Sequence, residues 1–303
     1  MAISRSQLVK ELEPGLNALF GLEYKRYENQ HAEIYTNENS DRAFEEEVML
    51  SGFANAQVKG EGAGVSFDEA QETFTARYTH ETVALAFAIT EEAIEDNLYD
   101  RLASRYTKAL ARSMSNAKQV KAVEPLINGL PSTDGFDSGD GVSLFNTSHP
   151  TVAGTFKNTL STQADLNETS LEQSMIDIAA MTDERGLRVA ARGVKMIIPS
   201  ELQFTAERLM KSQGRTGTAD NDINAIVSMG MIPQGYRVNN YLTDSDAFYI
   251  ITDVPNGMKM FTRAPLTTAM EGDFDTGNVR YKARERYSFG VSDPRGIFGV
   301  EGA

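Results

Sequence analysis

The sequence predicts an α+β fold built around one extended hairpin and one long helix. Two strand-like segments, Val48 to Val58 and Thr73 to Ile89, flank the glycine-punctuated loop Lys59-Gly60-Glu61-Gly62-Ala63-Gly64. An unbroken helical pattern follows, and a second hairpin is predicted near the C-terminus from residues 266–274 and 278–291. An extended hairpin that leads into a long helix suits a subunit that reaches over its neighbours better than it suits a compact enzyme.

The second strand of the first hairpin alternates with the period of two that is typical of a β-strand. Its first half alternates Phe74, Ala76 and Tyr78 with polar residues, and its second half carries only apolar and small residues. We expect a single strand over residues 73–89 that passes from exposed into buried surroundings.

The helix is predicted from about Glu91 to Glu124. Thr90 precedes it as an N-cap candidate, acidic residues dominate its first turns, and basic residues follow, which matches the helix dipole. An apolar stripe recurs every three or four residues, at Ile94, Leu98, Leu102, Tyr106, Leu110, Met114, Ala117 and Val120. Pro125 is expected to end the helix, whose length would be ~50 Å at ~1.5 Å per residue.

The first forty residues are predicted to form an arm. Leu8, Leu12, Leu16, Leu19 and Phe20 have helical spacing, but Pro14-Gly15 should divide this segment into a short helix, a break and a further turn. Residues 24–40 are polar and lack periodicity, so we expect them to be extended along another surface.

The remaining elements are short. Helices are predicted at residues 169–181, capped by Thr169 or Ser170, and at 200–210, capped by Ser200. Strands are predicted at residues 194–199, 236–241, 247–252 and 258–262, and residues 212–220 form a polar, glycine-rich loop.

Composition limits the function classes. The chain has 303 residues, enough for one large domain or two intertwined ones, and it contains no cysteine, which excludes disulfides and thiolate metal sites. The N-terminus lacks the apolar core of a secretion signal, and no apolar run is long enough to span a membrane. The formal net charge of −14 disfavours sequence-specific nucleic-acid binding. Such a charge fits a soluble acidic protein, and equally a protein that lies beside DNA without adhering to it.

No motif nominates an active site, a cofactor site or a metal site. The three histidines, His31, His80 and His149, are far apart in sequence, so a structural or solvated role is expected for each. Gly60, Gly62 and Gly64 lack the helix and the lysine of a phosphate loop. Asp134, Asp137 and Asp140 resemble a calcium loop only loosely, so a solvated turn is favoured over weak cation binding. An acid/base pair of carboxylates that are distant in sequence but close in space remains an open alternative. The sequence does not indicate any particular pair.

Four short stretches, taken in order, resemble the major capsid proteins of tailed bacteriophages, and specifically the Mu-like major head subunits. They are Glu11-Leu12-Glu13-Pro14-Gly15-Leu16-Asn17-Ala18-Leu19-Phe20, Arg77-Tyr78-Thr79-His80, Leu144-Phe145-Asn146-Thr147-Ser148-His149-Pro150, and Val194-Lys195-Met196-Ile197-Ile198-Pro199-Ser200. The resemblance spans nearly the whole chain and implies the Hong Kong 97-like fold. It divides the chain into an N-terminal arm (1–40), an extended hairpin or E-loop (41–89), a peripheral domain (90–184) with a spine helix (91–124), an axial domain (185–262), and return strands of the peripheral domain (263–303).

The resemblance also implies a function. Copies of the chain would assemble into the pentamers and hexamers of an icosahedral shell that encloses double-stranded DNA, in the cytoplasm of a bacterial host, and the protein would reside in the virion. A separate scaffolding protein, or none, is implied, because the E-loop begins within about fifty residues of Met1. A decoration or cement protein and a portal are further implied partners, whereas a membrane is not.

The expected site residues are therefore assembly contacts and not catalytic groups. The arm would place Leu12, Leu16, Leu19 and Phe20 on a neighbour, so deletion of residues 1–25 should leave a folded subunit that no longer assembles. The loop would contribute Lys59, Gly60, Gly62 and Gly64. In some relatives an E-loop lysine is crosslinked to a neighbour, but here no asparagine or glutamate matches by motif, so Lys59 is expected to be solvated or ion-paired. Gly214, Arg215 and Gly217 would lie in an exposed loop near the capsomer axis.

Two other classes remain open. One is an enzyme or binding module with an α+β fold, which would form a small oligomer with a convergent polar pocket. The other is an encapsulin-like compartment, which shares the capsid fold but encloses protein cargo.

Overall fold

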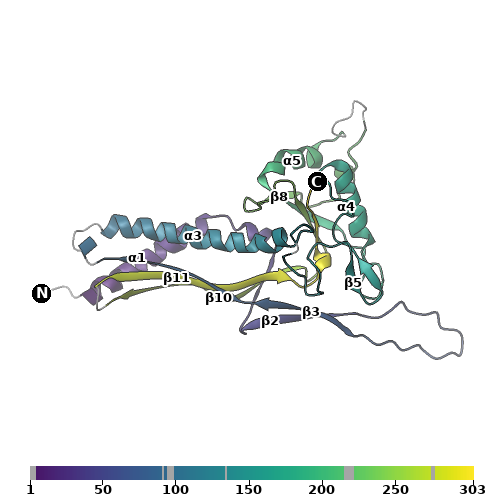
Figure 1. The fold of residues 1–303 in the computed structure, drawn as a ribbon, viewed down its shortest axis with the longest axis horizontal. Helices are drawn as coiled ribbons and strands as arrows, with labels where there is room; N and C mark the ends of the chain where they lie inside the picture. The colour runs from purple at the N-terminus through teal and green to yellow at the C-terminus, as the bar shows by residue number, and fades with distance from the viewer. Residues whose placement is uncertain (1–4, 91, 94–98, 134, 215–221, 274–276) are drawn as a thin grey trace.

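The computed structural model is an elongated molecule with a long platform, a compact lobe at one end and a thin loop that projects beyond the lobe (Figure 1). It describes residues 5–90, 92–93, 99–133, 135–214, 222–273 and 277–303. The described chain begins with α1, which starts at the far end of the platform, and the C-terminus lies in the lobe (Figure 1).

The platform consists of two helices laid along a four-stranded sheet. The helices are α1 (Arg5–Arg26) and α3 (Tyr99–Asn128). The sheet has the order β1-β10-β11-β4, formed by Thr36–Asn39, Met258–Gly272, Val279–Val291 and Glu81–Ile89. β1 pairs with β10 in parallel, and the other two pairings are antiparallel. β10 and β11 form the long C-terminal hairpin that the sequence predicts, although β10 is one strand where two, 258–262 and 266–274, are expected.

The long helix is confirmed, but its predicted end at Pro125 is wrong. Glu91 and residues 94–98 lie outside the described part of the chain, and α3 runs through Pro125 to Asn128. A proline inside a helix removes one hydrogen bond and strains the preceding turn, at a cost of roughly 3 kcal/mol. Leu126 and Leu130, on either side of the helix end, are almost fully buried in the main core. Their burial offsets the cost of Pro125 and holds the last turn in place.

The N-terminal segment is one continuous helix, so the predicted break at Pro14-Gly15 is also wrong. Leu16 and Phe20 are buried against α3 and β11, in a core cluster with Leu110, Met114 and Tyr281. This packing anchors the helix just beyond the proline's turn and stabilises it there.

Residues 24–40 are ordered and dock on their own subunit. They complete α1, form the 3₁₀ turn η1 (Gln30–Glu33), and end in β1. The Tyr35 hydroxyl donates a hydrogen bond to the Ala122 carbonyl (2.7 Å), and the His31 backbone N–H donates to Gln119 Oε1 (3.0 Å). The expectation of a docked segment is confirmed, with α3 of the same chain as the surface.

The first hairpin is shorter than predicted. Its strands are β2 (Phe44–Leu50) and β3 (Glu72–Thr79), and no strand lies between residues 51 and 71. The predicted strand over 73–89 is divided at His80 into β3, which pairs with β2, and β4, which pairs with β11. The expected direction of burial is reversed: Ala76 and Tyr78 are buried, whereas β4 lies at the edge of the platform sheet with most of its residues exposed.

The lobe is built on a second four-stranded sheet with the order β12-β9-β7-β8. These strands are Ile297–Val300, Phe248–Thr252, Gly193–Ile198 and Tyr236–Val238. Helices α4 (Glu168–Ala180), α5 (Gln203–Lys211) and α6 (Ala225–Met229) surround it, with the 3₁₀ turns η2 (Ser200–Leu202) and η3 (Pro294–Gly296). A small hairpin, β5 (His149–Thr151) and β6 (Gly154–Phe156), lies beside α4.

The lobe elements correspond to most sequence predictions, with three differences. Strand β12 and the β5–β6 hairpin are not anticipated by the sequence analysis. The N-cap of α4 is Asn167 and not Thr169 or Ser170. The Asn167 side chain accepts the Ser170 N–H (2.9 Å), and the Ser170 hydroxyl accepts the Asn167 N–H (3.0 Å). Ser200 caps no helix, since its hydroxyl donates to Glu201 instead.

Candidate assembly surfaces

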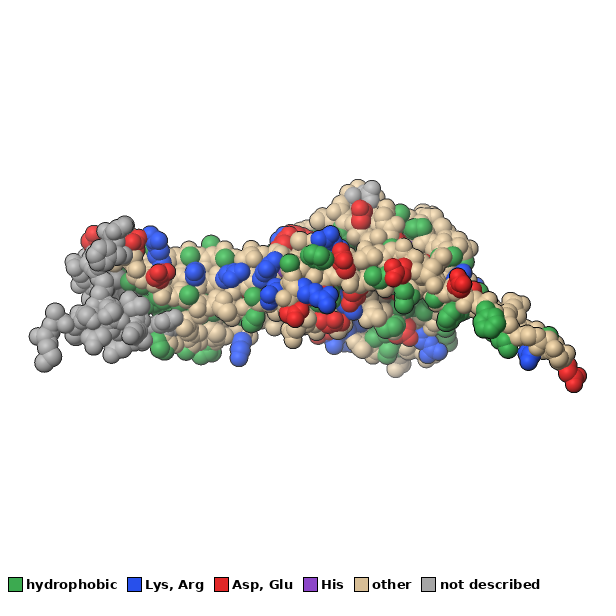
Figure 2. Space-filling model, turned by 90° about the horizontal axis from the view of Figure 1, so that it is seen from below, with side chains coloured by type: hydrophobic (Ala, Val, Ile, Leu, Met, Phe, Trp, Pro, Cys, Tyr) green, Lys and Arg blue, Asp and Glu red, His purple; other side chains and the backbone are tan. Residues whose placement is uncertain are grey.

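The loop between β2 and β3 carries large apolar side chains into solvent. Every residue from Gly52 to Gln71 is exposed. Val58 is 100% and Phe67 is 98% exposed, and Phe53 and Val65 are 60% and 69% exposed. Figure 2 shows these hydrophobic side chains on the projecting loop, whereas charges of both signs are mixed over the middle of the molecule. Exposed apolar residues gathered on one projecting segment indicate a surface that a partner covers.

The predicted loop contacts all lie on this segment. A Cβ atom added at Gly60, Gly62 or Gly64 would meet nothing within 4 Å, and Gly62 has the positive φ of +77° that favours glycine. Lys59 is exposed and forms no ion pair with a described residue. The structure thus leaves Lys59 solvated within the single subunit.

The base of the loop is tied to the rest of the chain by Arg185. Its guanidinium donates a hydrogen bond to the Glu69 carbonyl and lies 3.9 Å from the Asp68 carboxylate. Asp68 in turn accepts the backbone N–H groups of Ala54 (2.7 Å) and Glu69 (3.0 Å), and these bonds lower the pKa of its carboxyl. The loop therefore leaves the molecule in a defined direction.

The arm residues face their own subunit more than the sequence analysis expects. Leu16 and Phe20 are 8% and 2% exposed and pack on α3 and β11, so a neighbour is not needed to cover them. Leu19 is half-buried, and the side chain of Leu12 lies outside the described residues. Leu22, which the sequence analysis does not select, is 73% exposed on the outer face of α1.

The predicted capsomer-axis loop is described only at its start. Gly214 is exposed and forms an isolated bridge to Ile223, and Arg215 and Gly217 lie outside the described residues. On the same lobe, Phe204, Ile223 and Met229 are each at least 70% exposed. Sequence reasoning missed Phe204 and Met229 because an apolar residue in a short helix is ordinarily a core residue.

All three histidines are structural. His31 bonds to Gln119 (3.0 Å), and burial, with the nearby Lys118, lowers its pKa to about 4. His80 lies where β3 passes into β4 and bonds to Ser288 and Ser40, each at 2.9 Å. Burial, followed by the charge of Arg286, lowers the pKa of His80. These bonds join segments that are distant in sequence.

The expectation of a solvated acidic turn is wrong at Asp140. The Asp140 carboxylate is almost fully buried, 2.7 Å from His149 Nδ1, and accepts the Ser138 hydroxyl (2.7 Å). Burial opposes the charge on Asp140, but the bonds from His149 and Ser138 outweigh it and lower the pKa of the carboxyl. The second ring nitrogen of His149 faces Asn158 Oδ1 (2.9 Å), and the ring stacks on Phe156. This network closes the segment that leads from α3 into the lobe.

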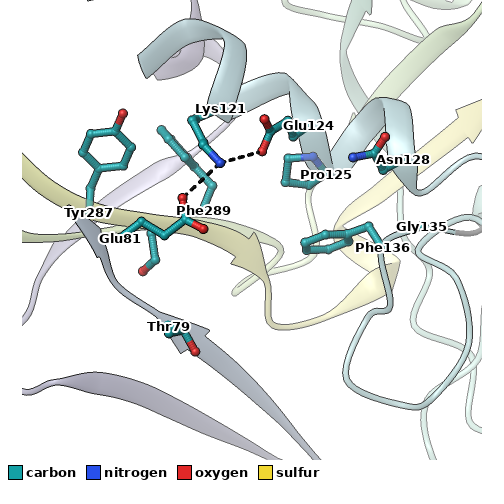
Figure 3. A pocket seen from close by; sticks show the side chains of 11 residues that line it. Thr79, Glu81, Lys121, Glu124, Pro125, Asn128, Gly135, Phe136, Tyr287 and Phe289 are labelled. Atoms are coloured by element: carbon teal, nitrogen blue, oxygen red, sulfur yellow. Dashed lines mark hydrogen bonds and ion pairs between the residues drawn. The ribbon is translucent and has the colours of Figure 1, made fainter. Parts of the chain in front are cut away.

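A cleft of about 280 Å³ lies where α3, β4 and β11 meet (Figure 3). Lys121 lies between two carboxylates, 3.0 Å from Glu81 and 3.2 Å from Glu124. Both bonds raise the pKa of Lys121, and the bond to Glu81 has the larger effect. Because Lys121 pairs with a carboxylate on each side, these groups form an ion-paired junction between α3 and β4. Pro125, Phe136 and Phe289 form its apolar wall.

Other site chemistry is not found in the part of the chain that the structure describes. There, no three carboxylate or imidazole groups converge as metal ligands. None of the described helices is both long and apolar enough to span a bilayer.

Comparison with known proteins agrees with this geometry. Residues 72–300 match the family described as phage capsid protein. A search among curated proteins found no match. Among solved structures, the chain is similar to a virus-like particle from Pyrococcus furiosus, with 12% identity over 94% of this chain and 98% of that one and a TM-score of 0.51.

Two further solved structures show the same likeness. The capsid of Myoviridae phage XM1 is 13% identical over 89% of each chain, with a TM-score of 0.55. The capsid of an empty GTA particle is 16% identical over 90% of this chain and 89% of that one, with a TM-score of 0.56. At such identities the likeness shows the fold, which is the Hong Kong 97-like fold that the family resemblance implies. Together with the family match over three quarters of the chain, it identifies the chain as a member of the phage capsid protein family and as a major capsid protein.

Proposed function

We propose that copies of this chain assemble, without covalent links, into the pentamers and hexamers of an icosahedral shell around double-stranded DNA. The observation that carries the proposal is the projecting loop, whose apolar side chains have no cover in the single subunit. Burying each such side chain stabilises an assembly by about 1.5–3 kcal/mol, and every subunit of a closed shell repeats the contribution.

We propose that the observed elements correspond to the domains that the family resemblance implies. The loop that extends the β2–β3 hairpin is the E-loop, α3 is the spine helix, and the platform is the peripheral domain. The lobe is the axial domain, although its core draws on a wider range than residues 185–262. Leu160, Leu171 and Ile178 pack there with Phe298 and Val300. Residues of the predicted peripheral segments therefore complete the lobe.

The charge supports DNA as the enclosed cargo without sequence-specific contact. A net charge of −14 repels phosphates, which lets packed DNA lie beside the wall without adhering to it. Assembly in the cytoplasm of a bacterial host, a separate scaffolding protein, a decoration or cement protein and a portal belong to the same proposal.

Lys59 is proposed to act without a covalent bond. Its position in the loop matches a crosslinking lysine by resemblance, but the chain offers no matching acceptor by motif. We expect no ladder of multimers on a denaturing gel of assembled shells. A ladder that disappears in Lys59→Ala would show that the crosslink forms.

Imaging of the purified protein tests the function. Negative-stain micrographs should show thin-walled icosahedral shells, and light scattering should show a particle far larger than one subunit. Particles from infected cells should contain nuclease-protected DNA, whereas protein cargo would favour the compartment alternative. A protein that stays monomeric at all concentrations would contradict the proposal.

A further inference from the structure

The lobe carries a pocket lined by methionines at one end of its sheet. This methionine pocket has a volume of about 420 Å³ and lies between the end of α4, the start of β7 and the segment after α6. It is lined chiefly by Met175, Ala179, Ala191, Met229, Met231 and Pro233. Met175 is buried, whereas Met229 is 70% exposed. Unbranched methionine side chains adapt their shape to an incoming apolar group.

Two opposite charges, Arg192 and Asp253, lie on the wall of the methionine pocket. Asp253 Oδ1 accepts the backbone N–H of Arg192 (2.8 Å), which fixes the carboxylate. The guanidinium of Arg192 is exposed, and no described carboxylate pairs with it. The pocket therefore presents an apolar interior flanked by one unpaired cation and one anion.

A matching knob lies on α5, which follows the other end of β7. Phe204, in the first turn of α5, is 74% exposed. Arg208, four residues after Phe204, lies on the same face of α5, and Glu201 lies three residues before Phe204 in η2. Neither pairs with an opposite charge among the described residues. The knob thus has an apolar centre with one anion and one cation beside it, the complement of the pocket.

The two surfaces cannot meet within one subunit. Gly193 and Val194, at the start of β7, line the pocket, whereas Phe204 follows the end of that strand at Ile198. Six strand residues at ~3.3 Å each separate them by roughly 20 Å. Figure 1 shows α4, which borders the pocket, and α5, which carries the knob, on two sides of the lobe.

We propose that Phe204 of one subunit enters the methionine pocket of the next, with Glu201 facing Arg192 and Arg208 facing Asp253. A knob and a pocket at opposite ends of one lobe make a head-to-tail contact, and such contacts close into rings when the rotation allows. A second copy of this chain fits both surfaces at once, because each subunit supplies one knob and receives one. This inference rests on the proposed ring-forming function and names the contact that closes the ring.

Reciprocal charge reversal tests the contact. Glu201→Arg and Arg192→Glu should each raise the critical concentration for shell assembly, measured by light scattering, at least fivefold, because like charges then face each other at every ring contact. The double variant, which restores opposite charges, should return to within twofold of the unmodified chain. Near-native circular dichroism and unchanged melting temperatures confirm that the variants fold. Single variants that assemble normally, or a double variant no better than the singles, would overturn the contact.

Disulfide trapping gives a second, independent readout, since the chain contains no cysteine. Glu201→Cys combined with Arg192→Cys should give covalent pentamers and hexamers on a non-reducing gel. Glu201→Cys combined with Ser245→Cys, an exposed position of the lobe outside the pocket, should give none. Shells that form without the expected ladder would refute the contact alone. Absence of shells from the unmodified chain would refute the proposed function.

Discussion

Individual polar residues hold this subunit together where its segments cross. Asp140, His149 and Asn158 form one buried network, and Arg295 forms another, with Glu184 at 2.6 Å and Asp293 at 3.2 Å. Buried charges are tolerated when each is paired and hydrogen-bonded, and removal of one partner leaves the other without compensation.

Asp140→Asn should therefore destabilise the fold by about 1–3 kcal/mol at pH 7, because an amide replaces the carboxylate that accepts bonds from both His149 and Ser138. The loss should depend on pH. The folded-state pKa of Asp140 lies below its unfolded value, so its carboxylate stabilises the fold above about pH 4 and this contribution is lost as the pH falls through the folded-state pKa. Urea unfolding at a series of pH values checks both statements. Asp137→Asn is the matched control, because Asp137 is exposed in the same turn and should change stability by less than about 0.5 kcal/mol.

The buried ion pair between Lys118 and Glu285 is expected to affect stability differently from the Asp140 network. The two side chains are 3.1 Å apart, and Glu285 is almost fully buried. Burial raises the pKa of Glu285, and attraction to Lys118 only partly offsets it. A raised folded-state pKa means that the protonated form favours folding, so the carboxylate of Glu285 weakens the fold as the pH rises through that value.

Glu285→Leu alone should cost about 3 kcal/mol, because the ammonium of Lys118 then loses its carboxylate partner. The double variant Lys118→Met/Glu285→Leu should recover most of this loss, since apolar groups of similar size need no compensation. Chemical unfolding of both variants makes the comparison. A double variant that is less stable than Glu285→Leu would show that the pair is a net source of stability.

At the scale of single elements, α1 has one face for its own subunit and one for solvent. Phe20 is buried beside Tyr24 and Tyr281, with ring centroids 6.0 and 6.5 Å away. Phe20→Ala should lower the free energy of unfolding by about 3–5 kcal/mol. Leu22→Ala, on the exposed face, should leave it within about 0.5 kcal/mol of the parent. Thermal unfolding separates these cases, and equal losses would contradict the two-faced arrangement.

This packing changes the expected result of deleting residues 1–25. Removal of α1 would expose Leu110, Met114, Tyr281 and the rest of the cluster that Leu16 and Phe20 cover. We expect the truncated chain to melt at a markedly lower temperature or to aggregate, and not merely to lose assembly. Near-native circular dichroism and an unchanged melting temperature would instead indicate that the arm acts by binding neighbouring subunits.

The elements show which parts of the fold local sequence predicts. Periodicity identified α3 and β11 because each buries one regular face, and short apolar runs identified β7 and β9, which are buried or half-buried along their whole length. It failed at Pro14 and Pro125, where packing of distant residues outweighs a local helix breaker. It also failed at β4, whose apolar residues lie on a sheet edge that is open in the single subunit.

The candidate surfaces likewise include some that the local sequence predicts and some that it does not. The exposed position of residues 59–64 was predictable because glycines mark a projecting turn. Phe204 and the methionine pocket were not, since only the tertiary structure shows that an apolar residue of a short helix faces solvent. The intramolecular burial of Leu16 was likewise hidden, because spacing reveals a helical face and not its partner.

At the scale of the whole molecule, the subunit has a self-sufficient body and a loop that is not part of it. The body contains two large cores, one that joins α3 to the return strands and one inside the lobe. The loop beyond Ser51 and Gln71 contributes to neither core. Folding and assembly should therefore be separable by a change confined to the loop.

Deletion of residues 55–67 tests this separation. All these residues are exposed, and the change brings Ala54 next to Asp68, whose carboxylate already accepts the Ala54 N–H at 2.7 Å. The bond between the Ser51 N–H and the Gln71 carbonyl (2.9 Å) continues to close the hairpin above β2 and β3. The free energy of unfolding should change by less than about 1 kcal/mol, because a shorter loop costs slightly less to close and no buried contact is lost.

Assembly, in contrast, should fail, because the deleted variant has lost Val58, Val65 and Phe67, the apolar side chains that the neighbours are proposed to cover. Light scattering should report no shells at concentrations at which the parent chain assembles fully. Phe67→Ser in the intact loop is the milder companion change and should raise the critical concentration without altering stability. If the deleted variant forms normal shells, the loop is dispensable, and the lobe and platform contacts alone must hold the capsid together.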